Sequence, residues 1–262
     1  NTYTGATHLE AGTLRIATDS NLGAAPGSAT AGHLTFDGGT LNTTATATLN
    51  ANRGITLGGG GGTIDTNAST TLTYNGVATG SGTLAKTGSG ILELGGANTY
   101  TGATNINAGT LRLGANDTLA NATAVTVAGG ATFDVASRTD TIGSLAGAGS
   151  VTLGSGSLTV GASNASTTYS GVASGTGNIV KTGTGTMIFS GANTFTGNLQ
   201  IDQGTVGLGA SNTFASSLVL NGGTLSTSGF SNTFNGVSLL SSSAINFNSM
   251  GGLLGVGTGS YT

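Results

Sequence analysis

The sequence predicts an all-β fold, a right-handed parallel β-helix of about eleven coils, and three observations lead to this prediction. The composition is that of a chain rich in turns, with 50 glycines in 262 residues, one proline and 6% charged residues. Short segments alternate apolar and polar residues, as in Leu14-Arg15-Ile16, which places the apolar side chains on one face of a strand. Blocks of sequence also recur at long intervals. Helix is disfavoured because glycine and threonine are weak helix formers.

The strongest of these observations is the long repeat. Residues 1–16 read NTYTGATHLEAGTLRI, residues 98–113 read NTYTGATNINAGTLRL, and residues 193–208 read NTFTGNLQIDQGTVGL. The offsets are 97 residues (98 − 1) and 95 residues (193 − 98). A unit of about 95 residues divides into four coils of ~24 residues, within the range of solenoid repeats. Crossovers between parallel strands are expected to be right-handed.

The repeat also sets the expected domain organisation. It covers most of the chain, and the chain starts inside a copy of the motif. We therefore expect a single repeat-built β-helix segment, excised from a longer protein. The segment covers 1–262, with related units at about 1–97, 98–192 and 193–262.

One stretch of the repeat resembles a known family. The run KTGSGILELGGANTYTGATNINAGTLRLG at 86–114 is similar to the passenger-associated transport repeat, also called the autotransporter-associated β-strand repeat. The copy at 181–209 is more degenerate, and the copy at 1–16 lacks the first half of the motif. The resemblance implies a β-helix exported to the bacterial surface, of the kind found in autotransporter passengers and adhesins.

Composition argues against several other classes of protein. The chain has no cysteine, which excludes disulfides and thiolate metal sites. Six Lys and Arg residues and a net charge of -3 give no basic footprint for nucleic acid. No apolar run approaches the ~18 residues of a membrane span. We expect no nucleic-acid partner, no membrane contact within this segment and no cofactor.

No cluster of catalytic residues is evident. Enzymes built on β-helices gather several carboxylates on one face. The acids here are dispersed along the chain, at Glu10, Asp19, Asp37, Asp65, Glu93, Asp117, Asp134, Asp140 and Asp202. Asp134 and Asp140 lie close to Arg138, a pattern that favours a solvated turn over a site. We expect no enzyme activity and no catalytic, cofactor-binding or metal-binding residues.

Histidines and cations at repeat positions allow two interpretations. Asn105 and Gln200 stand where the first copy has His8, which indicates an outward-facing strand position; His33 is expected to be structural as well. Lys86 and Lys181 lie 95 residues apart (181 − 86) and are expected on the surface. There they would aid solubility or, alternatively, space contacts to an acidic glycan. Arg15 and Arg112 form a second such pair.

Aromatic residues also occupy fixed repeat positions. Tyr3, Tyr100 and Phe195 share one position, and Tyr74 and Tyr169 share another. Aromatic side chains at fixed places in a solenoid stack within the core or cover a corner. The alternative is a platform for binding sugars.

Together these features predict a non-catalytic, structural or adhesive extracellular stalk, or a fibre-forming segment, of a secreted or cell-surface bacterial protein. Unpaired strand edges at the end coils and weak charge favour self-association into fibres. Host or matrix glycans and proteins are the candidate partners. The alternative is a glycan-binding or polysaccharide-degrading β-helix module. Aromatics or threonines on consecutive coils would favour binding, and three or more converging acids would favour an enzyme.

Overall fold

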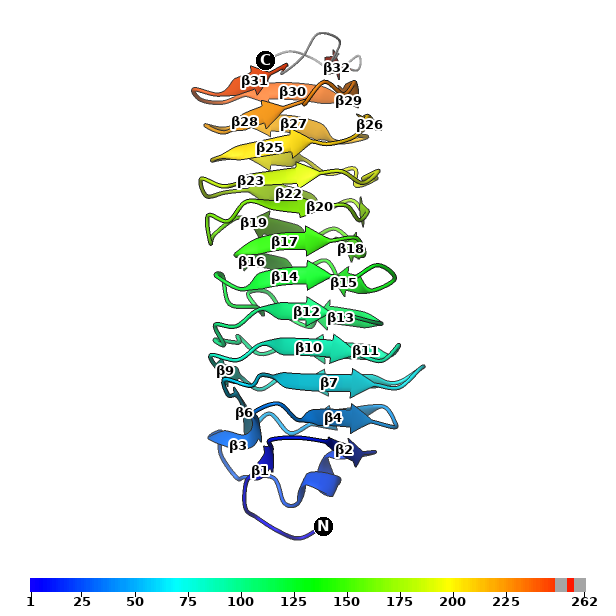
Figure 1. Cartoon of the computed structure of the whole chain (residues 1–262), viewed down its shortest axis with the longest axis vertical. Helices are drawn as coiled ribbons and strands as arrows, with labels where there is room; N and C mark the ends of the chain where they lie inside the picture. The colour runs from blue at the N-terminus through cyan, green and yellow to red at the C-terminus, as the bar shows by residue number, and fades with distance from the viewer. Residues whose placement is uncertain (248–253, 257–262) are drawn as a thin grey trace. The chain divides into compact units, whose positions relative to one another are not determined.

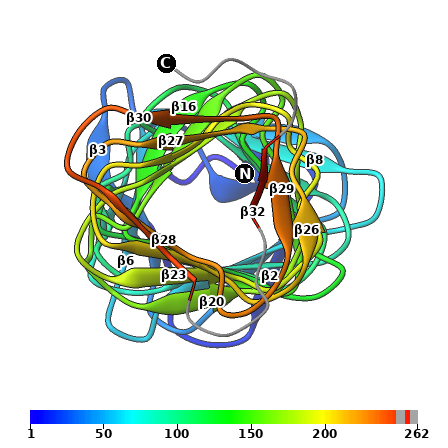
Figure 2. The same ribbon diagram turned by 90° about the horizontal axis from the view of Figure 1, so that it is seen from above.

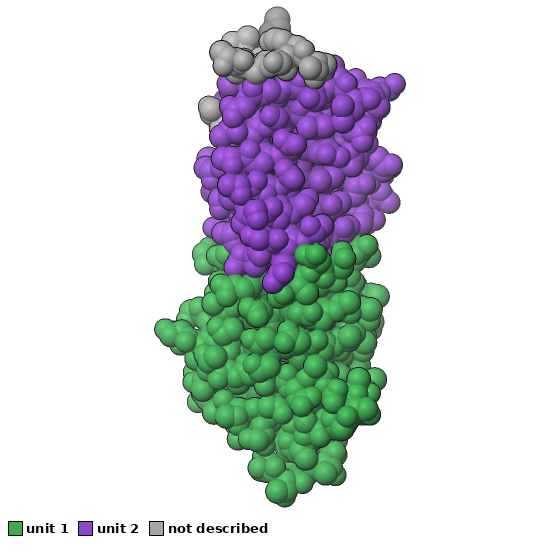
Figure 3. Space-filling view, turned by 180° about the vertical axis from the view of Figure 1, so that it is seen from behind, with its two compact units in different colours: residues 1–133 green, residues 134–262 purple. Residues whose placement is uncertain are grey.

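The computed structural model describes residues 1–247 and 254–256, and strands make up nearly all of its regular structure (Figure 1). Among the described residues the one helical element is a single 3-10 turn, η1 (Asp19–Leu22), so the all-β prediction is confirmed. No described helix has the length and apolar character needed to span a membrane. The chain divides into two compact units, Asn1–Phe133 and Asp134–Thr262, coloured separately in Figure 3.

Unit 1 is built from three parallel sheets, each named here after one of its strands. The β3 sheet has the order β1 (Thr7–Leu9), β3 (Thr30–Phe36), β6 (Arg53–Leu57) and β9 (Ala78–Gly80). The β7 sheet runs through β2 (Thr13–Ile16), β4 (Thr40–Thr43), β7 (Gly62–Thr66), β10 (Leu84–Thr87), β12 (Thr104–Ile106) and β14 (Ala124–Val127). The β8 sheet runs through β5 (Ala47–Leu49), β8 (Thr71–Tyr74), β11 (Ile91–Leu94) and β13 (Thr110–Leu113). The boundary between the units falls within β15 (Thr132–Asp134).

Unit 2 repeats this plan. Its β23 sheet runs through β17 (Ser144–Gly147), β20 (Thr167–Tyr169), β23 (Thr186–Phe189), β25 (Thr205–Leu208), β28 (Thr224–Ser226) and β31 (Ala244–Asn246). Its β19 sheet runs through β16 (Thr139–Ile142), β19 (Ser157–Val160), β22 (Asn178–Lys181), β24 (Leu199–Ile201), β27 (Ser217–Leu220) and β30 (Gly236–Leu239). Its remaining strands belong to two separate sheets: β18 (Ser150–Thr152) pairs with β21 (Ala173–Ser174), and β26 (Asn212–Thr213), β29 (Asn232–Phe234) and β32 (Leu254–Val256) form a three-stranded sheet.

Each unit is thus a parallel β-solenoid, with strands that wind around a central core (Figure 2). The pairing is parallel throughout both units, for example between β10 and β12 and between β25 and β28. Six strands in the β7 sheet and six in the β23 sheet agree with the predicted fold of about eleven coils. The single-domain organisation and the right-handed winding stay predictions.

The coils vary in length: at the start of unit 1 Thr13 pairs with Thr40, a spacing of 27 residues (40 − 13), and later coils are shorter than predicted. Leu84 pairs with Thr104, a spacing of 20 residues (104 − 84), and Thr205 pairs with Thr224, a spacing of 19 (224 − 205). The expected division of the long repeat into four coils of ~24 residues is therefore wrong. In unit 1 the first copy of the motif contributes β1 to the β3 sheet, whereas the second copy contributes the corresponding strand, β12, to the β7 sheet. The 97-residue offset thus moves the motif to another side of the unit.

The core follows from the alternation within each strand. In β8, β11 and β13 every second side chain is buried and points inward. Aromatic side chains stack within unit 2, where the rings of Phe214 and Phe234 lie 4.7 Å apart and nearly parallel, and those of Tyr169 and Phe189 meet edge to face at 6.2 Å. Such burial of apolar surface, at roughly 25 cal/mol per Å², is the main favourable contribution to folding.

Candidate functional site: buried repeat positions and an uncharged hollow

Lys86 lies inside unit 1, contrary to the prediction of a surface position. It occupies the same face of β10 as Leu84, and its side chain is fully buried. Its Nζ donates hydrogen bonds to the carbonyl oxygens of Thr87 (2.6 Å), Gly88 (2.8 Å) and Ala108 (3.1 Å). Thr87 ends β10 and Gly88 begins the turn that follows, whereas Ala108 belongs to the next coil. Lys86 therefore joins two successive coils.

Lys181 has the same arrangement in unit 2. Its exposed fraction is 1%, and its Nζ donates to the carbonyl oxygens of Thr182 (2.5 Å), Gly183 (2.7 Å) and Gln203 (3.4 Å). Because both lysines are buried, the expected solubilising role and the alternative of spaced contacts to an acidic glycan are both wrong for this pair. The shared role is to satisfy carbonyl groups where the chain turns.

Burial shifts the titration of both lysines. Desolvation lowers the pKa of Lys86 from 10.5 to about 8, and the negative charge of Asp65 opposes this shift. Desolvation also lowers the pKa of Lys181. Each side chain therefore carries an ammonium group that is costly to bury and that compensates by donating to three carbonyl oxygens.

A repeated asparagine makes a second connection between coils, which the sequence did not reveal. Asn98 is 4% exposed; its Oδ1 accepts from the amide of Ala78 (2.8 Å), and its Nδ2 donates to the carbonyl oxygens of Gly96 (3.0 Å) and Thr118 (2.9 Å). Asn193, 95 residues further on, is equally buried and accepts from the backbone amide one coil earlier at 2.9 Å. The first residue of the NTYTG and NTFTG motifs is thus a structural link.

Four of the five aromatic side chains at repeat positions are buried in the core, as predicted: Tyr74, Tyr100, Tyr169 and Phe195. Tyr3 is the exception, with 41% of its surface exposed. Burial raises the pKa of Tyr74 to about 12, although a hydrogen bond with the backbone of Ile55 opposes the shift. Burial also raises the pKa of Tyr169. Buried rings offer no platform to a sugar.

A third buried cation, Arg53, anchors η1. Its Nε donates to Asp19 Oδ1 at 2.8 Å, its Nη1 to the carbonyl oxygen of Leu22 at 2.8 Å, and its Nη2 to that of Gly23 at 2.6 Å. The Nδ1 atom of His33, a residue 6% exposed, lies 3.4 Å from Arg53 Nη1. This buried position agrees with a structural role for His33. The repeat-position histidine, His8, is exposed as predicted.

The 3-10 turn lies beside strand β5, the end strand of its sheet in unit 1. Asp19 Oδ1 accepts from the backbone amide of Asn50, directly after β5. This side of the first coils is therefore covered by a helical turn, which cannot extend a sheet. β1 and β2 remain end strands of the other two sheets among the described residues.

The acids do not converge. Asp140 is fully buried and accepts from the amide of Thr141 at 2.8 Å, so the prediction of a solvated turn is wrong at this residue. Asp134 accepts from the amide of Ala136 (3.0 Å) and from the Thr152 hydroxyl (2.9 Å), which shapes the turn after β15. Within residues 1–247 and 254–256, no group of three or more His, Cys, Asp or Glu could hold a metal ion.

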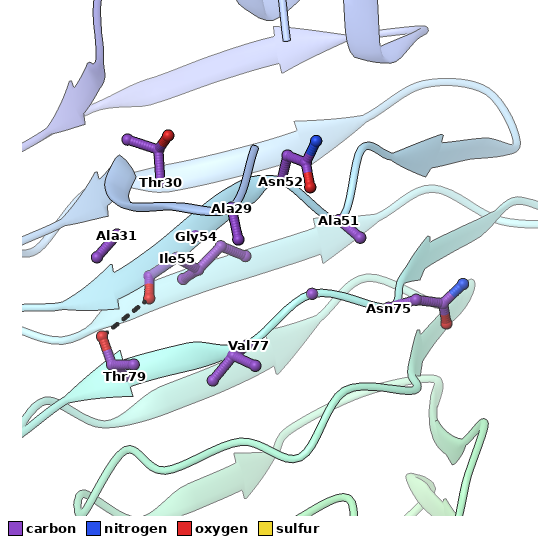
Figure 4. A pocket seen from close by; sticks show the side chains of 11 residues that line it. Ala29, Thr30, Ala31, Ala51, Asn52, Gly54, Ile55, Asn75, Val77 and Thr79 are labelled. Atoms are coloured by element: carbon purple, nitrogen blue, oxygen red, sulfur yellow. Dashed lines mark hydrogen bonds between the residues drawn. The ribbon is translucent and has the colours of Figure 1, made fainter. Parts of the chain in front are cut away.

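Unit 1 has a hollow of about 400 Å³ over the starts of β3, β6 and β9 (Figure 4). Small apolar residues and neutral polar ones line it: Ala29, Thr30, Ala31, Ala51, Asn52, Gly54, Ile55, Asn75, Gly76, Val77 and Thr79. The Thr79 hydroxyl donates to the carbonyl oxygen of Ile55 at 3.3 Å on its floor. None of the lining residues carries a charge or a nucleophile suited to catalysis.

Fold and geometry together define a class of protein: a repeat-built β-solenoid in which buried lysine and asparagine side chains join successive coils. Comparison with known protein families agrees with this class. The passenger-associated-transport-repeat matches residues 1–16, 84–113 and 179–208, so the chain carries the repeat that the sequence resembles. These matches include the buried positions Lys86, Asn98 and Lys181.

A curated relative extends the similarity. The chain is 36% identical over 182 residues, 66% of its length, to the adhesin BmaC autotransporter of Brucella suis biovar 1 (strain 1330). The match spans 5% of that much longer protein. No solved structure matches the chain. The two comparisons confirm the resemblance to autotransporter passengers with adhesin character.

Proposed function

We propose that the chain is a non-catalytic, adhesive or structural segment of a passenger exposed at the bacterial surface. The observation that carries this proposal is the combination of passenger-associated transport repeats with coil-joining side chains inside both units. The similarity to an adhesin autotransporter supports the surface location and the adhesive role. The dispersed acids and the uncharged hollow support the absence of catalysis.

Adhesion and catalysis make opposite predictions for the purified chain. Beads coated with the chain should adhere to host cells or matrix proteins more than beads coated with an unrelated β-solenoid. The same preparation should leave a panel of acidic and neutral polysaccharides intact. Release of reducing ends from any polysaccharide would contradict the proposal. Absence of adhesion, with the fold intact, would restrict the role to that of a stalk.

Self-association is the second part of the proposal. Low charge reduces repulsion between copies. Exposed apolar side chains near β30, Leu239 (59% exposed) and Leu240 (66% exposed), favour contacts there. Concentration-dependent sedimentation and electron microscopy test this part. Short, dispersed monomers at high concentration would count against fibre formation.

A further inference from the structure

The chain contains three Asn-Gly dipeptides, and the structure distinguishes one of them. They are Asn75-Gly76, Asn221-Gly222 and Asn235-Gly236, and all three asparagines are exposed. An asparagine followed by glycine is the pair most prone to cyclise, because glycine has no side chain to hinder attack by its amide nitrogen, and asparagine is among the thermolabile residues of proteins. Hydrogen bonding then decides which pair reacts in the folded state.

Two of the pairs are restrained. Asn221 Nδ2 donates to Asp202 Oδ1 at 3.1 Å, and the amide of Gly222, the nucleophile that would attack, donates to the Ser243 hydroxyl at 2.9 Å. Asn235 Nδ2 donates to the carbonyl oxygen of Ala215 at 2.6 Å. Cyclisation at either pair requires the loss of at least one hydrogen bond.

Asn75-Gly76 is free of these restraints. Among the described residues, neither the Asn75 carboxamide nor the Gly76 amide has a hydrogen-bond partner. The pair forms the corner between β8 and β9, at the rim of the hollow (Figure 4). The Tyr74 hydroxyl holds this corner from inside, donating to the Val77 carbonyl oxygen at 3.0 Å. A Cβ on Gly76 would lie 2.5 Å from the carbonyl oxygen of Ala51, so a glycine is required here.

We propose that Asn75 is a site of spontaneous deamidation, which makes the rim of the hollow negatively charged. The Gly76 nitrogen attacks Cγ of Asn75, a C–N bond forms, and ammonia leaves. Water then opens the succinimide at one of its two carbonyl carbons and gives aspartate or isoaspartate. No oxidant or cofactor is needed. The product adds one carboxylate to a hollow whose lining residues are all neutral.

The change also affects the stacking of coils. A Cβ on Gly96 would overlap the carbonyl oxygen of Gly76, so these two backbones lie in close contact. The amide of Gly95 donates to the Tyr74 carbonyl oxygen at 2.9 Å beside them. Isoaspartate lengthens the backbone by one methylene at this corner. We expect the hydrogen bond from the Gly95 amide to the Tyr74 carbonyl oxygen to weaken in the isoaspartate form.

The test compares the three asparagines within one sample of the full chain. The folded chain and a denatured sample are incubated in mildly alkaline buffer, and peptide mapping by mass spectrometry measures conversion at each asparagine. In the folded chain Asn75 should convert at least about fivefold faster than Asn221 or Asn235, the factor that one lost hydrogen bond imposes. In denaturant the three rates should be similar.

The repeat supplies a matched control variant. Ser170 precedes Gly171 at the corresponding corner of unit 2, so Asn75→Ser introduces a side chain that this corner already accommodates. The variant should fold normally and should lack the acidic species that the parent chain forms on ion exchange. The proposal is overturned if Asn75 converts no faster than both restrained asparagines in the folded chain, or if Asn75→Ser acidifies at the parent rate.

Discussion

Replacing Lys86 with methionine tests whether the buried lysines join successive coils. Methionine keeps most of the side-chain volume but leaves the carbonyl oxygens of Thr87, Gly88 and Ala108 without their donor. Hydrogen bonds from a charged donor contribute about 1.5–3 kcal/mol each, so three contribute roughly 4–9 kcal/mol. The substitution also removes a buried charge, and relief of its desolvation offsets part of this loss. The lost bonds outweigh it, and we expect a net loss of about 3 kcal/mol.

The loss of stability in Lys86→Met should be confined to the coils next to the substitution. Solenoid coils contact mainly their neighbours, so hydrogen exchange is a better assay than one global melting temperature. In Lys86→Met the amides of residues 107–110 should exchange faster than in the parent, while unit 2 should be unaffected. Arg112→Met is the control, because Arg112 lies at the surface, 3.8 Å from Glu93, and exposed ion pairs contribute at most about 1 kcal/mol.

The pH dependence gives a second measurement on the same variant. The folded pKa of Lys86, about 8, lies below its unfolded value of 10.5. Between these values the unfolded chain binds more protons, so the stability of the parent rises with pH by at most about 1.4 kcal/mol per unit. The difference in stability between the parent and Lys86→Met should therefore widen over this pH range. Equal exchange in Lys86→Met and Arg112→Met, with no widening, would refute the role assigned to the lysine.

Three further outcomes follow from the same structure. Gly96→Ala should destabilise unit 1 by about 3 kcal/mol, because its Cβ would overlap the Gly76 carbonyl oxygen, whereas Gly59→Ala, with open space around it, should have little effect in thermal melts. Asn98→Ala removes bonds to three backbone groups and should cost about 2–3 kcal/mol, with faster exchange one coil earlier; unchanged exchange there would contradict the link. The raised pKa of Tyr74, about 12 against 10.0, means that stability should fall as pH rises from 10 to 12, and a Tyr74→Phe variant should have a smaller slope, with the contribution of Tyr169 left in place.

The sequence was sufficient for the fold because its signals are local and redundant. Alternation within strands such as Leu111-Arg112-Leu113 fixes which side chains face inward, and the recurring blocks indicate a solenoid. Coil length was not accessible in this way. The motif recurs every 95–97 residues, but its copies do not return to the same sheet of unit 1, so dividing that length by a whole number of coils gave the wrong value.

The buried cations show where sequence reasoning failed. Lys86 lies on the same buried face of its strand as Leu84. Arg53 likewise shares the buried face of its strand with Ile55 and Leu57. This alternation is a usable signal for burial, but charged side chains are mostly exposed in proteins, and that general expectation fails here. What makes burial tolerable is a set of backbone carbonyls, and for Lys86 one of them comes from Ala108 in the next coil. That contact exists only once the coils have stacked.

The hollow could not be predicted for a related reason. Its lining combines small residues from three successive corners, among them Ala29, Ala51 and Val77, and no single segment of sequence marks it. Its neutral character follows from the low overall charge of the chain, which the composition does show.

The move of the motif between sheets of unit 1 has a consequence for recognition. His8 in the first copy projects from the β3 sheet, and the equivalent Asn105 in the second copy projects from the β7 sheet. A partner that binds the side chain at this repeat position would therefore approach the two copies from different directions. Two rigid receptors on one flat surface could not engage both copies together, whereas flexible or encircling partners could.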